Sequence, residues 1–373
     1  MQRLEEETLK PSPVGEIVRY VVVLGLAGFI IYYYYFRMPI NYVDKQTVGE
    51  TMATHFAVKV HGFPDNKDWD EVAHAIRQTL DSVDRAMSTY KKDSEVSRFN
   101  ASDSTDWFDV SKETAEVVQL SLEISQLTGG AFDITVGPLV GLWGFGAGRE
   151  RIGLEAIKSR IEETQNRVGY EKLEVRLDPP ALKKSIPNLS IDLSAIAKGY
   201  AVDQVAGVLN VHRINNYMIE VGGEVRCNGN KSEKNDWLIG IEKPIPGQQD
   251  EFPGVQRTIR LGNRSLATSG NARSYHEIDG FLLSHVIDPR TGFPTEYISP
   301  NGEVPLERLG SVSVIDSTCA RADALATAMF VLGEKDGLAL AEKEGIAVLF
   351  LLRSAASDDK GSEIREATST AFP

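Results

Sequence analysis

The chain has 373 residues, of which 42% are hydrophobic, 25% charged and 8% aromatic, a composition typical of a folded globular protein rather than a disordered or fibrous one. Its formal net charge is −13 and it contains no long basic run, which argues against nonspecific nucleic-acid binding, since that depends on phosphate neutralisation by lysine and arginine. Two cysteines are too few for a disulfide scaffold or a CxxC-type zinc site, and the six histidines form no HExxH or HxH pair, so a zinc hydrolase is disfavoured.

An almost wholly apolar segment lies near the N-terminus, at residues 17–36. A helix needs about 20 such residues to cross the hydrocarbon core of a membrane, and the run Tyr32–Tyr35 fits an aromatic belt at one interface. A helix buried in protein is the alternative, but uniform apolarity suits lipid better. No cysteine follows the segment and no small-residue cleavage site is evident, so we expect a retained anchor rather than a lipoprotein or a removed signal peptide.

Basic residues around this segment predict its orientation. Three precede its apolar centre and two follow it, namely Arg3, Lys10 and Arg19 against Arg37 and Lys45. This weak excess places the N-terminus in the cytoplasm and the body outside. The expected organisation is a cytoplasmic N-terminus at 1–16, a transmembrane anchor at 17–36, a linker at 37–49, a catalytic domain at 50–353 and a disordered polar tail at 354–373.

The pattern of the main body predicts an α+β fold. Apolar residues at helical spacing indicate a helix over 69–87, and a second helix is expected over 111–127, where Gly129-Gly130 ends it. Strands are expected at 217–221, 237–242, 258–261, 311–315 and 347–352. Short links such as Gly222-Gly223 favour antiparallel pairing. Because strands are grouped rather than alternating with helices, we expect one large domain with a largely antiparallel sheet and flanking helices.

The segment 191–203 combines a strand end with a helix start. A strand is expected to end at Asp192 and a helix to begin near Ser194, so that either side chain would cap the helix. The free N–H groups of a first helical turn also form an anion site suited to phosphate, to which Lys198 would add a positive charge. For this segment taken alone, capping without a ligand is the favoured explanation.

A helix of small residues is expected over 319–329. Asp323 and Thr327 are four residues apart, so their side chains share one face of this helix. A carboxylate beside a hydroxyl offers the hard oxygen ligands that Mg²⁺ prefers. The purely structural alternatives are that Asp323 is a capping or surface residue and that the Thr327 hydroxyl forms a hydrogen bond to the backbone of its own helix.

Three further segments carry weaker signals. His285 precedes the turn Asp288–Gly292, and a histidine there can act as a general base because its ordinary pKa lies near 6.5; a buried structural histidine is the alternative. Tyr90 and Phe132 each place an aromatic ring beside polar groups, as a flat heterocycle would require, although core and turn would look the same.

Five co-linear motifs together resemble the FAD:protein FMN transferase family, also called the ApbE family, over about residues 52–352. They read MSTYKKDSEVSRFN, GGAFDITVGP, IDLSAIAKGYAVD, SHVIDPRTG and ADALATA. The resemblance implies Mg²⁺ ligands at Asp323, Thr327 and the backbone carbonyl of Ala195. It also implies contacts to FAD at Met52, Tyr90, Ala131, Phe132, Asp133, Asp192, Lys198 and Ile287. Two positions depart from the family pattern: Ala326 where some relatives carry a second carboxylate, and Ala53 where a glycine is usual.

The implied reaction transfers FMN from FAD to a Thr or Ser hydroxyl of an acceptor protein, with His285 taking the hydroxyl proton and AMP leaving. The acceptor is expected to be a subunit of a membrane redox complex, and the enzyme to face the outside of the bacterial cytoplasmic membrane. Two alternatives keep the same residues: a Mg²⁺-dependent FAD pyrophosphatase, in which water attacks, and a non-catalytic flavin-binding assembly factor.

Overall fold

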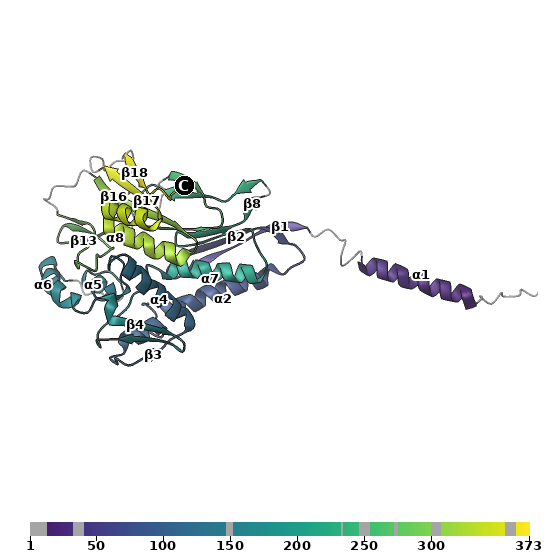
Figure 1. Cartoon of the computed structure of the whole chain (residues 1–373), viewed down its shortest axis with the longest axis horizontal. Helices are drawn as coiled ribbons and strands as arrows, with labels where there is room; N and C mark the ends of the chain where they lie inside the picture. Colours follow the sequence, from purple (N-terminus) through teal and green to yellow (C-terminus); the bar gives the residue numbers. More distant parts are fainter. Residues whose placement is uncertain are drawn as a thin grey trace, which may run out of the picture. The chain divides into compact units, whose positions relative to one another are not determined.

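The computed structural model describes residues 13–32, 41–146, 152–232, 234–245, 254–271, 275–299, 307–354 and 363–373. The chain divides into two compact units, which are considered separately (Figure 1). One unit comprises Met1–Val43 with Pro64–Lys67, and the other comprises Asp44–Phe63 with Asp68–Pro373. The second unit holds almost the whole predicted catalytic domain.

The first unit contains helix α1, at Pro13–Tyr32. This helix covers part of the predicted anchor at 17–36, whose last residues, with most of the tyrosine run, lie outside the described residues. In the part of the chain that the structure describes, no helix has both the length and the apolarity needed to cross a membrane, so the predicted anchor is not confirmed.

Seven further α-helices and two 3₁₀ turns are described. The helices are α2 (Trp69–Met87), α3 (Glu95–Ala101), α4 (Lys112–Leu127), α5 (Gly137–Leu142), α6 (Leu154–Gln165), α7 (Ala197–Val211) and α8 (Cys319–Glu344), and the turns are η2 (Ile134–Val136) and η3 (Tyr170–Lys172). The two helices predicted in the first half of the domain are confirmed as α2 and α4. Side chains of Asp68 and Ser111 accept hydrogen bonds from the first turns of α2 and α4, which explains where these helices begin.

The main sheet has eight strands in the order β1-β2-β6-β7-β12-β16-β17-β18. These strands are β1 (Tyr42–Thr51), β2 (Thr54–Pro64), β6 (Tyr217–Val221), β7 (Glu224–Asn228), β12 (Ser265–Gly270), β16 (Glu307–Asp316), β17 (Ala347–Ser354) and β18 (Ile364–Thr368). All neighbouring pairs from β2 to β18 are antiparallel. The α+β fold with a large antiparallel sheet and flanking helices is therefore confirmed.

The remaining strands form small sheets outside the main one. They are β3 (Phe108–Asp109), β4 (Leu173–Leu177), β5 (Pro180–Lys184), β8 (Asn230–Ser232), β9 (Asn235–Asp236), β10 (Leu238–Glu242), β11 (Val255–Arg260), β13 (Tyr275–Ile278), β14 (Phe281–Ser284) and β15 (Tyr297–Ile298). They pair as β3-β5-β4, β8-β9, β10-β11 and β13-β14-β15.

The two faces of the main sheet are buried against different layers. Along β17, Val348, Phe350 and Leu352 belong to the core shared with α2, α4, α7 and α8. The alternate residues Leu349 and Leu351 belong to a second core shared with the β10–β11 hairpin. Successive side chains of a strand point to opposite faces, so a strand buried on both sides has the continuous apolar sequence seen here.

Two predicted boundaries are wrong. The linker expected at 37–49 includes most of β1, an edge strand of the main sheet. The disordered tail expected at 354–373 includes β18, which pairs with β17 from Leu349↔Thr368 to Arg353↔Ile364. Phe372 beyond it is buried in the second core. The polar character of the tail is that of an edge strand, which exposes one side to solvent.

Candidate active site

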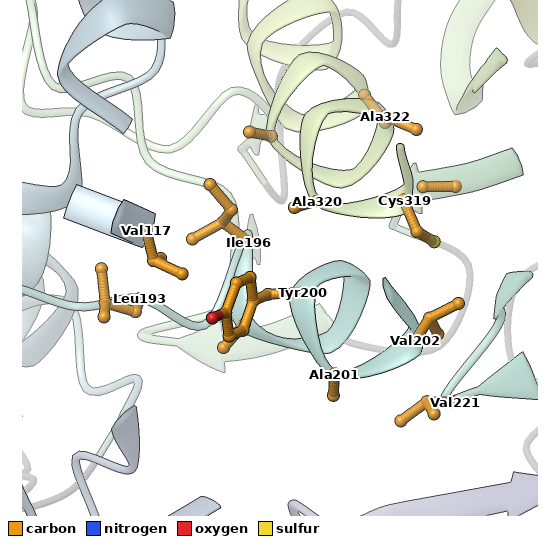
Figure 2. Packing of buried hydrophobic residues seen from close by; sticks show 14 of the residues in the cluster. Val117, Leu193, Ile196, Tyr200, Ala201, Val202, Val221, Cys319, Ala320 and Ala322 are labelled. Atoms are coloured by element: carbon orange, nitrogen blue, oxygen red, sulfur yellow. The ribbon is translucent and has the colours of Figure 1, made fainter. Parts of the chain in front are cut away.

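The predicted phosphate and metal segments meet where α7 and α8 begin. Gly199, in the first turn of α7, lies so close to α8 that an added Cβ would be 2.3 Å from the carbonyl oxygen of Cys319 and 2.8 Å from Cβ of Asp323. The Gly199 N–H donates to Oδ2 of Asp323 at 3.0 Å. Figure 2 shows the start of α8 beside the start of α7, with Ala320 on the side of α8 that lies towards α7. Small residues in both motifs therefore permit the approach.

Lys198 lies between two buried carboxylates. Its Nζ is 2.8 Å from Oε1 of Glu224 and 3.7 Å from Oδ1 of Asp323, and both acidic residues are only 3% exposed. Burial alone lowers the pKa of Lys198, but the charges of Asp323 and Glu224 outweigh it and hold the pKa above its usual value. Burial also raises the pKa of Glu224, an effect that the Lys198 charge only partly offsets. The ammonium is therefore charged at neutral pH.

The first turn of α8 is capped from α7. Asp203 accepts hydrogen bonds from the backbone N–H groups of Cys319 and Ala320, each at 3.0 Å. Thr318, the residue before α8, makes no side-chain cap of its own. Asp203 also pairs with Arg226 of β7. This carboxylate thus fixes α8, and with it Asp323, against α7 and the sheet.

The proposed metal ligands are all oxygens, as a hard cation requires. Tyr200 N–H donates to the carbonyl of Ile196, and Ala195 stands two residues before the start of α7. Thr327, one turn after Asp323, has its Oγ1 2.9 Å from Oγ of Ser269 on β12. Among the described residues no three His, Cys, Asp or Glu side chains form a metal cluster, and this mixed set of one carboxylate, one hydroxyl and one carbonyl contains only one such residue.

Hydrogen bonds and close contacts link the other motifs to this centre. Asn100 of the first motif exchanges two 2.8 Å hydrogen bonds with the backbone of Ile191. The N–H of Asp192 donates to the carbonyl of Ile134 at 2.7 Å, which joins the GGAFDITVGP and IDLSAIAKGYAVD segments. A Cβ on Gly130 would be 3.8 Å from Cγ of Arg290 in the SHVIDPRTG segment. The five motifs therefore form one connected region.

The helix start predicted near Ser194 is wrong. Asp192 accepts hydrogen bonds from the N–H and the hydroxyl of Ser194, at 2.8 and 2.5 Å, and so closes a separate turn. Helix α7 begins only at Ala197, and the residue before it, Ile196, makes no side-chain cap. The first-turn N–H groups of Ala197 and Gly199 bond outside the helix: that of Ala197 donates to the carbonyl of Leu193 at 2.8 Å, and that of Gly199 donates to Asp323.

The predicted flavin-contact residues lie in different settings. Ala131, Phe132, Asp133 and Ile287 are buried, whereas Tyr90 is 67% exposed. Met52, with φ of +49°, and Ala53, with φ of +57°, form the two-residue turn between β1 and β2. Met52 is partly buried against the main core. Asp133 accepts hydrogen bonds from Thr135 and from the Tyr170 N–H, and its pKa is raised by burial.

His285 follows β14, at the start of the loop that contains Ile287. Its half-buried ring lies edge-on to Phe145, with 6.5 Å between ring centroids. Hydrogen bonds fix the loop on both sides of His285. The Ser284 hydroxyl donates to Asn271 Oδ1 at 2.6 Å, and the Trp143 indole N–H donates to the carbonyl of Gly292 at 2.7 Å. Asn271 immediately follows β12, the strand whose Ser269 contacts Thr327.

A cavity of about 470 Å³ lies elsewhere, lined mainly by α2, α3 and the start of α4, and no predicted site residue lines it. Other residues at the centre were not predicted from the sequence. Glu224 and Asp203 are the most consequential. Glu224 follows the Gly222-Gly223 turn, where a charged residue is typical of a solvent-facing position in a hairpin. Nothing in the local sequence therefore indicates that Glu224 belongs to the site.

Comparison with known proteins gives a consistent result. The ApbE family matches residues 52–350. An FAD:protein FMN transferase of Vibrio cholerae is 41% identical over 82% of this chain and 86% of its own, and one of Haemophilus influenzae is 38% identical over the same shares. The structure of the flavin transferase ApbE from Vibrio cholerae superposes with a TM-score of 0.75 and 38% identity, over 89% of this chain and 99% of its own. That of the Pseudomonas stutzeri flavinyl transferase ApbE gives 0.73 and 31%, over 90% and 97%. The chain belongs to the ApbE family.

Proposed function

We propose that the protein is an FAD:protein FMN transferase, which moves FMN from FAD to a Ser or Thr hydroxyl of an acceptor protein and releases AMP. The observation that carries this proposal is the junction of α7 and α8, where Lys198 and Asp323 meet within a chain 41% identical to a transferase of that name. A positive charge, the positive end of a helix dipole and a carboxylate are the groups that a pyrophosphate and its cation require.

The metal assignment fits the donor set. Asp323, Thr327 and the Ala195 carbonyl would hold Mg²⁺, which when bound neutralises charge on the phosphates of FAD. Lys198 adds a charged donor, and the positive end of the α7 dipole favours negative charge on the phosphates. Met52, Tyr90, Ala131, Phe132, Asp133, Asp192 and Ile287 are the proposed contacts to the rest of FAD.

The transfer step uses His285 as general base. It takes the proton of the acceptor hydroxyl, whose oxygen attacks the phosphorus of the FMN half of FAD. An oxygen–phosphorus bond to the acceptor forms, the bond to the AMP phosphate oxygen breaks, and AMP leaves with the electron pair. His285 is suited to this role because hydrogen bonds on either side of it fix its loop, which limits its movement.

The test is an assay with FAD, Mg²⁺ and a candidate acceptor, in which mass spectrometry follows the mass of one attached FMN. His285→Ala should lower the rate of transfer by a factor of about 10² to 10⁴ while FAD still binds. His74→Ala, an exposed position on α2, is the control and should leave the rate unchanged. Free FMN without labelled acceptor would indicate hydrolysis, and tight FAD binding without any product would indicate an assembly factor.

A second pair of variants tests the metal. Asp323→Asn keeps an oxygen for the Gly199 N–H but removes the charge, so transfer should fall strongly while thermal unfolding changes little. Asp336→Ala, an exposed position on the same helix, should behave as wild type. Equal activity of Asp323→Asn and wild type would reject the assigned ligand.

The location of the protein stays a prediction from the apolar segment 17–36. We propose that this segment tethers the protein to the bacterial cytoplasmic membrane, that the catalytic domain, whose start we now place near Asp44, faces outward, and that the acceptor is a subunit of a membrane redox complex. Fractionation of cells, followed by protease treatment of spheroplasts, tests this. Recovery of the full-length protein in the cytosolic fraction would refute it.

A further inference from the structure

Two buried carboxyl groups share one ammonium at the α7–α8 junction. Lys198 lies within reach of both Glu224 and Asp323. The Arg226–Asp203 pair nearby is neutral as a unit. Among the described residues, none donates a hydrogen bond to the buried Oε2 of Glu224. A buried carboxyl oxygen without a partner is costly, so its presence points to a role in the site.

The backbone holds Glu224 and Lys198 in fixed positions. Glu224 is the first residue of β7, directly after the Gly222-Gly223 turn, in which both glycines have positive φ. A Cβ on Gly222 would lie 2.9 Å from Cγ2 of Thr54 and 3.1 Å from Cδ of Lys198. The aliphatic part of the Lys198 side chain therefore lies against the turn that precedes Glu224. This position directs the ammonium towards the carboxyl groups of Glu224 and Asp323.

The two carboxylates compete for this ammonium. At 2.8 Å the contact with Glu224 is a direct hydrogen bond, whereas at 3.7 Å the approach to Asp323 is only an ion pair. Oδ1 of Asp323 thus stays available, while Oδ2 is taken by the Gly199 N–H. If the charge of Glu224 were removed, Coulomb attraction would draw the ammonium onto Asp323, where it would block a ligand oxygen of the cation.

We propose that Glu224 is a positioning residue for the metal site: it holds Lys198 away from Asp323 and so keeps that carboxylate open to Mg²⁺. This inference rests on the proposed function, which makes Asp323 a ligand. Glu224 touches neither the cation nor FAD in this role. It acts through Lys198, and its effect must therefore depend on Lys198 being present.

The experiment is calorimetric titration of the full chain with Mg²⁺ alone, without FAD. Glu224→Gln should bind Mg²⁺ about 10- to 100-fold more weakly than wild type, the range seen for residues that support metal ligands indirectly. Glu224→Asp, which restores the charge, should recover part of the loss. Lys198→Met should bind at least as tightly as wild type, and adding Glu224→Gln to it should change the affinity less than twofold.

Two results would overturn the inference while leaving the transferase proposal intact. One is a Glu224→Gln variant with wild-type affinity. The other is an equal loss in the presence and absence of Lys198, which would mean that the carboxylate acts on the cation directly. If wild type and Asp323→Asn bind Mg²⁺ alike, the metal assignment itself fails, and the inference with it.

A kinetic measurement separates positioning from general damage to the fold. In the flavin-transfer assay, Glu224→Gln should raise the Mg²⁺ concentration needed for half-maximal rate, while kcat at saturating Mg²⁺ stays within about twofold of wild type. A lower kcat with an unchanged Mg²⁺ requirement would contradict the proposal.

Discussion

Gly199→Ala places a methyl group where α7 and α8 touch. The added Cβ would be 2.3 Å from the carbonyl oxygen of Cys319, about 1.1 Å closer than the 3.4 Å at which ordinary contact begins. The obstructing atoms include backbone, so the two helices must separate. Overpacking of this kind costs about 1–3 kcal/mol. Separation also strains the hydrogen bonds from α8 to Asp203, and losing such a cap costs about 1 kcal/mol more.

The higher helix propensity of alanine offsets about 0.5–1 kcal/mol of this cost. The free energy of unfolding, measured by urea titration, should therefore fall by about 2 kcal/mol in Gly199→Ala. Gly207→Ala on the same helix is the matched control, because no atom of the described residues lies within 4 Å of its added Cβ. Alanine favours a helix over glycine, so this control should be more stable than wild type by about 0.5–1 kcal/mol. A Gly199→Ala variant as stable as wild type would refute the close approach.

Three further predictions concern other parts of the structure. Ala53 has φ of +57°, so Ala53→Gly should raise the free energy of unfolding in urea by about 0.5 kcal/mol, the relief of left-handed strain less the greater freedom of unfolded glycine. Ala57→Gly, inside β2, should instead lower it by about 1 kcal/mol, and equal effects would contradict the turn geometry. Asp203→Ala uncaps α8 and leaves Arg226 without its partner, so the free energy of unfolding should fall by about 3 kcal/mol in the same titration; a loss below 1 kcal/mol would show that the cap is dispensable. Burial lowers the pKa of Lys184 below the usual 10.5, so between these values the unfolded chain holds more protons than the folded one. The stability of wild type relative to Lys184→Met should thus rise as the pH rises toward 10.5, and a fall over that range would contradict the assigned burial.

Much of the fold follows from local patterns in the sequence. Helix α2 could be predicted to its last residue because its apolar positions recur at helical spacing, and strand β6 because it stands alone between turns. The edge strands β1 and β18 could not, since a strand with one solvated side and a polar sequence resembles a linker or a tail. Strand β18 is defined by its pairing with β17, and no local feature of its sequence indicates that pairing.

The candidate site divides in the same way. Asp323 and Lys198 could be named because each belongs to a motif, but their contact depends on the packing of α7 against α8. Glu224 belongs to no such motif, and its partner is 26 residues away. The start of α7 was misplaced because Asp192 satisfies Ser194 in a separate turn, which competes with the helix for the same N–H group.

The strand order of the main sheet has a consequence for how the chain folds. Neighbours in the sheet follow chain order, but Phe56 of β2 pairs with Val221 of β6, which closes a loop of 165 residues (221 − 56). Leu266 of β12 and Ile315 of β16 close only 49 (315 − 266). The longer closure costs about 1 kcal/mol more in chain entropy. Strands β12 to β17 should therefore associate early, and the N-terminal hairpin should dock last, after the helical segment between β2 and β6 has become compact. During refolding, the turn that carries Met52 would be among the final parts of the proposed flavin site to reach its place.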